Sequence, residues 1–296
     1  MIELVIPQRR RSLGGFDVGR VLPFAKRRMV GPFVFFDHMG PIELHAGIPR
    51  DVDVRPHPHI GLATVTYLFA GEIMHRDSVG SSQPIVPGEV NWMTAGRGIT
   101  HSERFERARR EGDRIHGIQA WVALPEADEE TDPWFAHHEG EDLPAWREAG
   151  VHGRLIAGEA YGMRAAVRTF SPLFYAHFEM DGGARGTLPD RYAERALYVA
   201  TGAIEMNGAR HRAGEMLVMA PGPADFVALE PSTVMALGGE PVGERFLFWN
   251  FVSSRPERLE QAKADWQAGR MKLPDGDGDE FIPLPAAPNP PANPMS

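Results

Sequence analysis

Short apolar runs recur along the chain, each rich in Val, Phe or Tyr and each followed by turn residues. Examples are FVFFD, ATVTYLF, IQAWVAL, LFYAHFEM, ALYVA, MLVMA and RFLFWNFV. The 32 glycines and 26 prolines are scattered between these runs. Short strands bounded by turns are typical of sandwiches and barrels. The pattern therefore predicts an all-β protein.

Helical periodicity is rare and is clearest near the C-terminus. In PERLEQAKADWQAGRM, Leu259, Ala262 and Trp266 fall at helical spacing after Pro256, a residue suited to a first helical turn. This predicts a short C-terminal helix. From Leu273 the chain is Pro-rich and acidic, which predicts an extended and loosely packed tail.

An internal repeat is visible in the spacing of Tyr, Gly, Ile, Glu and Met. Tyr67, Gly71 and Ile73 recur as Tyr198, Gly202 and Ile204; Gly88, Glu89, Met93 and Gly96 recur as Gly214, Glu215, Met219 and Gly222. Two copies of one β-unit are expected, with a boundary in the polar stretch HHEGEDLPAWREAGVHG. We therefore expect an N-terminal domain at 1–140 and a C-terminal domain at 141–296.

The composition is that of an ordinary globular protein with a formal net charge of -9. This charge argues against a general nucleic-acid or anionic-membrane surface. The first thirty residues are locally basic, and a solvated face explains them better than a nucleic-acid arm because no aromatic residues are interleaved.

The chain contains no cysteine, which excludes disulfides, thiolate metal sites and a cysteine nucleophile. A reducing compartment suits such a chain. No apolar run approaches the ~20 residues of a membrane span, and the N-terminus does not resemble a signal peptide. We expect a cytoplasmic protein.

Two pairs of side chains suggest a reaction centre. His57 and His59 lie in RPHPHIG, and His101 and Glu103 lie in GITHSE. Side chains two apart on a strand point the same way. If the two strands are neighbours, three nitrogens and one oxygen converge, a ligand set for a transition metal with positions left open. Fe(II), Mn, Ni, Cu and Zn all suit this set.

The repeat separates this hypothesis from an ordinary role as buried polar residues. In the second copy the four ligand positions fall on Leu188, Asp190, Val227 and Leu229. All four ligand types are lost together, which predicts one metal-binding barrel and one barrel without metal ligands.

Other polar residues are weaker candidates. His75 and Asp77 share a strand face and could orient a ligand, although simple exposure is the favoured interpretation. Gln119 and Trp121 could form a pocket wall or ordinary core. The DGDGDE run begins like a calcium loop but lacks its sixth-position glycine and twelfth-position glutamate.

The chain resembles the pirin family of the cupin superfamily. The resemblance runs through GGFDVGRVLP, GPFVFFDHMGP, RPHPHIGLATVTYLFAGEIMHRDS, GEVNWMTAGRGITHSE and HGIQAWVALP. It implies a bicupin: two antiparallel β-barrels, the N-terminal one with a single metal, usually iron, and the C-terminal one without. The family's ligands fall on His57, His59, His101 and Glu103. The general cupin glutamate is replaced by Ala63, but pirins supply this carboxylate from the HSE run.

The same resemblance implies two classes of function. Some pirins resemble quercetin 2,3-dioxygenase, which opens a flavonol ring with molecular oxygen. Others are metal- or redox-dependent partners of transcription regulators or metabolic enzymes. We favour an iron-dependent dioxygenase that acts on a flavonol-like or other small aromatic substrate, with Glu103 as the base. A regulatory protein-binding role is the alternative, and a purely structural metal is a third.

Overall fold

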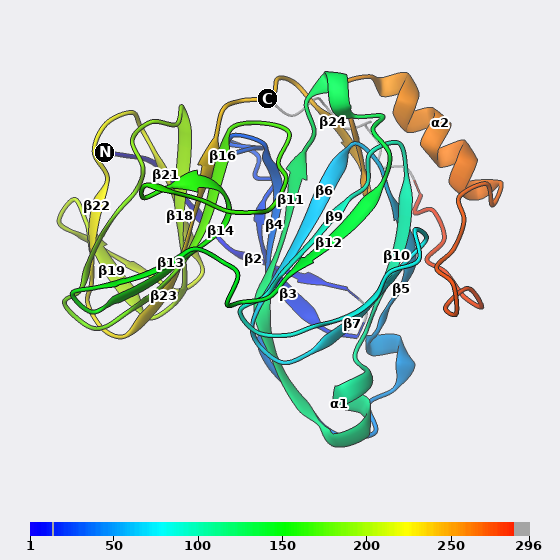
Figure 1. Ribbon diagram of the computed structural model, residues 1–296, viewed down its shortest axis with the longest axis horizontal. Helices are drawn as coiled ribbons and strands as arrows, with labels where there is room; N and C mark the ends of the chain where they lie inside the picture. Colours follow the sequence, from blue (N-terminus) through cyan, green and yellow to red (C-terminus); the bar gives the residue numbers. More distant parts are fainter. Residues whose placement is uncertain (14, 287–296) are drawn as a thin grey trace. The chain divides into compact units, whose positions relative to one another are not determined.

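The computed structural model of the protein describes residues 1–13 and 15–286. It is almost entirely β-structure and divides into two compact units (Figure 1). The histidine unit comprises Arg11–Val18, Met39–His137 and the segment from Val242; the second unit comprises Met1–Arg10, Gly19–His38 and His138–Pro241. The predicted all-β class is confirmed.

The histidine unit contains a four-stranded sheet and part of a seven-stranded sheet. The four-stranded sheet has the order β5 (Val54–His59), β10 (Ile99–Arg104), β7 (Ile73–Asp77) and β8 (Ser82–Ile85). The seven-stranded sheet has the order β12 (Trp134–His138), β9 (Val90–Thr94), β6 (Leu62–Ala70), β11 (Asp113–Ala123), β4 (Phe33–Leu44), β3 (Asp17–Leu22) and β2 (Arg9–Ser12). The last three strands each divide between the two units.

The second unit repeats this arrangement. One sheet has the order β1 (Ile2–Pro7), β21 (Glu215–Met219), β18 (Glu194–Thr201), β23 (Ser232–Gly239), β16 (Leu173–Met180), β14 (Val151–Ala160) and β13 (Ala145–Glu148), with β15 (Met163–Arg164) paired to β14. The other has the order β17 (Arg185–Thr187), β22 (Asp225–Ala228), β19 (Ala203–Met206) and β20 (Ala209–Arg212).

The predicted repeat is confirmed by the strand order. The four-stranded sheets β5-β10-β7-β8 and β17-β22-β19-β20 have the same topology, and β6 pairs with β9 as β18 pairs with β21. The repeated glycines are required by the backbone: Gly71 and Gly202 have φ of +93° and +76°, which favours glycine. Each links two strands of its copy, so the glycine spacing preserves the turn in both barrels.

Short helices and a two-stranded ribbon complete the histidine unit. These are α1 (Glu106–Glu111), α2 (Pro256–Gln267), the ribbon β24 (Phe246–Phe248) and β25 (Phe251–Ser253), and two 3-10 turns at Arg50–Val52 and Glu126–Asp128. The helix predicted near the C-terminus is α2, drawn in orange in Figure 1, with Pro256 in its first turn. Its predicted apolar face is buried beside the ribbon, in a cluster with Ile60, Phe248 and Phe251.

Each compact unit is assembled from three separate segments of the chain. The expected domains, 1–140 and 141–296, are instead continuous segments. The first strand, β1, pairs with β21 of the second unit. The segment from Val242, with α2, groups with the histidine unit. Strand pairing and apolar burial decide which unit a terminal segment joins, and neither is visible in a division made along the chain.

The described part of the tail from Leu273 contains no helix or strand, as predicted for an extended tail, but it is not loosely packed throughout. Asp277 accepts hydrogen bonds from Ser102 Oγ at 2.5 Å and from Arg104 Nε at 2.8 Å. The amide of Ile282 donates to the carbonyl of Pro56 at 2.8 Å. The tail is therefore fixed to β10 and β5. The remainder of the tail, 287–296, lies outside the described residues.

Candidate metal centre

The strands carrying the two histidine pairs are neighbours. β5 and β10 are antiparallel, and His101 lies opposite His57 while Ile99 lies opposite His59. The rings of His57, His59 and His101 are buried, and their centroids lie 4.4 to 5.0 Å apart. Pairing of two strands with i, i+2 histidines brings three imidazoles together, as the sequence predicts.

The ring nitrogens of this triad are spaced as metal ligands are. One nitrogen from each ring lies within 4.8 Å of the others, and His101 Nε2 lies 3.2 Å from His59 Nε2. Two nitrogens bound to one transition metal are about 2.9–3.4 Å apart, given metal–nitrogen distances near 2.1 Å. The residues present therefore fit a metal ion.

Burial keeps the three rings neutral. It lowers the pKa of His57 to about 4, although a hydrogen bond to the Arg55 backbone partly offsets this. Burial also lowers the pKa of His59 and His101 well below the usual value, and neighbouring histidines lower both further. Metal ligation needs deprotonated nitrogen. His57 Nδ1 donates to the carbonyl of Arg55 at 2.8 Å, which leaves its Nε2 lone pair for a ligand bond.

Glu103, the expected fourth ligand, lies next to the triad without joining it. Its carboxylate is not part of the group of mutually close ligand atoms found among the described residues. The register of β10 and β5 shifts between His101 and Glu103. Gln119 Nε2 donates to Glu103 Oε1 at 3.4 Å, and Thr66 Oγ1 donates to Gln119 Oε1 at 2.6 Å. Thr66 thus fixes which end of the amide faces the carboxylate.

Burial raises the pKa of Glu103 to about 7, and the hydrogen bond from Gln119 opposes the shift. A carboxyl group with such a pKa can exchange a proton near neutral pH. Both residues of the predicted pair Gln119 and Trp121 contact members of the site. Gln119 is hydrogen-bonded to Glu103, and the Trp121 ring meets the ring of His59 edge-on at 5.1 Å.

The favoured interpretation of His75 and Asp77 as exposed residues is wrong. Both are buried, at 2% and 1% exposure. His75 Nε2 lies 2.9 Å from Asp77 Oδ2, and His75 Nδ1 lies 3.3 Å from His101 Nδ1. Sequence reasoning also missed Phe135, whose ring stacks on His75 at 4.4 Å. Phe135 lies on β12, and no sequence spacing relates it to β7.

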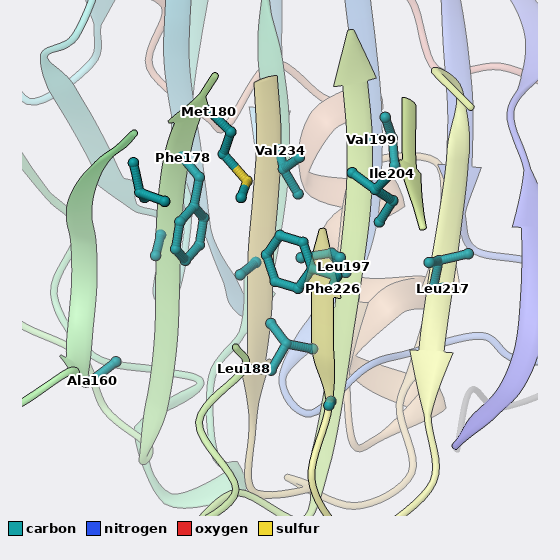
Figure 2. Close-up of a cluster of buried hydrophobic side chains, with 14 of the residues drawn as sticks. Ala160, Phe178, Met180, Leu188, Leu197, Val199, Ile204, Leu217, Phe226 and Val234 are labelled. Carbon is teal, nitrogen blue, oxygen red and sulfur yellow. The ribbon is translucent and has the colours of Figure 1, made fainter. Parts of the chain in front are cut away.

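The interior of the second unit is apolar where the histidine unit carries its ligands. Leu188, the predicted counterpart of His57, belongs to a buried apolar cluster with Phe178, Leu197, Phe226 and Val234 (Figure 2). Leu229, the predicted counterpart of Glu103, is 42% exposed and lies outside this interior, so the residue-by-residue alignment is wrong at that position. Among the described residues, the group of close metal-ligating side chains found is the histidine triad alone. The structure thus agrees with the predicted contrast between the two copies.

No helix among the described residues is long and apolar enough to span a membrane.

A duplicated antiparallel barrel with a buried histidine triad in one copy defines a bicupin. The family model "Pirin" matches residues 15–122, and the model "Pirin C-terminal cupin domain" matches residues 175–272. The chain therefore belongs to the pirin family.

Similar proteins cover almost the whole chain. A pirin-like protein of Caulobacter vibrioides is 61% identical over 96% of this chain and 100% of its own length. The crystal structure of a quercetin 2,3-dioxygenase from Acinetobacter baumannii has a TM-score of 0.89 at 31% identity, covering 97% of this chain and 96% of that chain. A second structure of that name from the same organism has a TM-score of 0.85 at 28% identity, covering 92% and 98%.

Proposed function

We propose that this protein is a metal-dependent dioxygenase of the quercetin 2,3-dioxygenase type. Its substrates would be molecular oxygen and a flavonol-like or other small aromatic molecule. The observation that carries the proposal is a buried triad of neutral imidazoles beside a carboxyl group whose pKa is about 7. The similarity to structures named quercetin 2,3-dioxygenase supports it.

The proposed ligands are His57, His59, His101 and Glu103. The three imidazoles form the base of the site, and a rotation of the Glu103 side chain would bring its carboxylate to the same ion. Fe(II) is the first metal to test, and Mn, Ni, Cu and Zn also suit nitrogen and oxygen ligands. The metal would supply Lewis-acid polarisation of the substrate oxygens.

The residues around the triad perform the remaining tasks. Glu103 Oε accepts the substrate hydroxyl proton, so Glu103 is the proposed catalytic base as well as a ligand. Gln119 holds Glu103 Oε1 by its amide hydrogen bond and is itself held by Thr66. The indole of Trp121 lies against His59 and offers an apolar wall to an aromatic ring. The buried strands around the triad exclude bulk water.

The test combines metal analysis with oxygen uptake. Metal-free protein is loaded anaerobically with Fe(II), Mn, Ni, Cu or Zn in parallel, and bound metal is measured by elemental analysis. We expect about one ion per chain, oxygen uptake with a flavonol panel and loss of the flavonol absorbance. His59→Ala should lose both metal and uptake.

The matched control is His137→Ala. This histidine lies in the same unit but bonds Asn91 Oδ1 at 2.9 Å, outside the triad. It should keep metal and uptake. If the protein binds metal but consumes no oxygen with any flavonol, the proposed enzymatic activity is contradicted. The alternative, a regulatory protein-binding role, would then be favoured.

A further inference from the structure

His75 and Asp77 are buried polar residues that the proposed function does not use. Both lie on β7, which pairs with β10, so that Asp77 is opposite His101 and His75 is opposite Glu103. Their side chains form one chain of contacts that ends at His101. Buried polar groups are usually hydrogen-bonded, and the direction of each bond here can be deduced.

The chain of contacts starts from a fixed carboxylate. Asp77 Oδ1 accepts hydrogen bonds from the backbone amides of Val79 at 3.0 Å and Ser81 at 2.9 Å. Two amide donors on one carboxylate oxygen favour the ionised form of Asp77, whatever His75 does. An ionised carboxylate only accepts hydrogen bonds. His75 Nε2 must therefore donate to Asp77 Oδ2, 2.9 Å away.

The direction then passes through two rings. A neutral imidazole carries one proton, so a neutral His75 that donates from Nε2 has a lone pair on Nδ1. That atom faces His101 Nδ1 at 3.3 Å, and His101 Nδ1 must donate to it. His101 Nε2 is left with a lone pair, and it points toward His59 Nε2. The stacked ring of Phe135, at an interplanar angle of 17°, holds the plane of His75.

We propose that Asp77 and His75 are positioning residues that fix the tautomer of His101, so that its Nε2 offers a lone pair to the metal. The effect on metal affinity rests on the proposed metal centre, whereas the tautomer of His101 is a property of the metal-free protein. Partners that orient a ligating histidine typically change metal affinity 10–100-fold.

Asp77→Asn should reverse the chain of hydrogen bonds. The new amide oxygen would still accept from Val79 and Ser81, so its NH2 group would face His75 Nε2. His75 would then carry its proton on Nδ1 and donate to His101, and the His101 proton would move to Nε2. We expect Co(II) to bind about 10–100-fold more weakly than to the wild type.

His75→Phe removes the relay without imposing the wrong tautomer, and it keeps a ring against Phe135. We expect a loss of less than about tenfold in Co(II) affinity, since His101 can adopt either tautomer. The double variant of Asp77→Asn with His75→Phe should bind like the single His75→Phe, and therefore better than Asp77→Asn. A structural role alone predicts that the double variant is the weakest binder.

The readouts are Co(II) titration by visible absorption and 15N NMR of the histidine rings in metal-free protein. Wild type should show an unprotonated Nε2 on His101, and Asp77→Asn a protonated one. Arg76→Gln is the matched control, since Arg76 lies between the two residues and pairs with Glu106. It should change neither readout.

Two results would overturn the relay: a protonated His101 Nε2 in the wild type, or a His75 ring that carries both protons at neutral pH. Failure of the wild type to bind Co(II), Fe(II) or Zn(II) would instead contradict the metal centre of the proposed function. In that case the NMR measurement still decides the tautomer, because it needs no metal.

Discussion

At the residue scale, the centre depends on how each polar group is held. The three imidazoles are kept neutral by burial, and His57 is fixed by a hydrogen bond to the backbone of Arg55. Glu103 differs, since its nearest partner is a neutral amide rather than a cation. A buried carboxyl group without a cationic partner retains its proton more readily. A substitution of Glu103 can therefore separate metal binding from proton transfer.

Glu103→Gln should separate them. The amide has the same shape but is a far weaker base, so turnover should fall about 10²–10⁴-fold, the usual contribution of a positioned base. Three histidines remain, so most of the bound metal should be retained. Steady-state oxygen uptake and elemental analysis measure the two effects. The matched control is Glu106→Gln, which changes a carboxylate that pairs with Arg76 outside the site. Full turnover in Glu103→Gln would show that another residue is the base.

At the element scale, the C-terminal segment stabilises the strands that carry the triad. Along β10, Ser102 and Arg104 alternate with the site residues His101 and Glu103. The side chains of Ser102 and Arg104 both donate hydrogen bonds to Asp277. Arg104 is almost fully buried and also contacts Asp53 and Glu280. Trp266 Nε1 of α2 donates to the carbonyl of Ile282, which anchors the segment near β5. The acidic DGDGDE run thus has a structural use that is not calcium binding.

Asp277→Ala should destabilise the histidine unit. Hydrogen bonds to charged groups contribute about 1.5–3 kcal/mol, and Arg104 would keep Asp53 and Glu280 as partners. We expect the free energy of unfolding, measured by urea denaturation, to decrease by an amount in that range. Asp275→Ala is the matched control, because the exposed Asp275 bonds an exposed lysine, Lys272, at the surface. Equal stability of the two variants would contradict the anchoring role.

At the scale of the whole molecule, two copies of one barrel carry different interiors. The second unit fills its interior with apolar side chains, whereas the histidine unit keeps buried polar groups. Buried histidines also occur outside the triad. Burial, together with neighbouring cations, lowers the pKa of His177 to about 3 and that of His116 to about 4. Each ring folds in its neutral form.

These histidines predict that the protein is less stable in acid. Below the unfolded pKa of about 6.5 the unfolded chain binds protons that the folded chain does not, so stability falls with decreasing pH by up to ~1.4 kcal/mol per pH unit per histidine. For His177 the loss continues down to about pH 3. His177→Gln should flatten the dependence measured by urea denaturation between pH 6 and 4. An unchanged pH dependence in His177→Gln would contradict this assignment.

Much of the fold and of the site was predictable because it depends on local periodicity. The period of two in RPHPHIG and GITHSE put each ligand pair on one strand face. The repeated Tyr, Gly and Met spacing revealed the duplication, and Leu259, Ala262 and Trp266 located α2. Each of these signals is carried by residues close together in the chain.

The sequence by itself therefore determined the β-class, the duplication and the identity of the triad. Only the tertiary structure decided that Glu103 bonds Gln119, that His75 and Asp77 lead to His101, and that Asp277 holds β10. The physical reason is that hydrogen-bond direction and burial depend on strands and segments distant along the chain. Spacing can place a side chain on a face, but the opposing strand selects its partner.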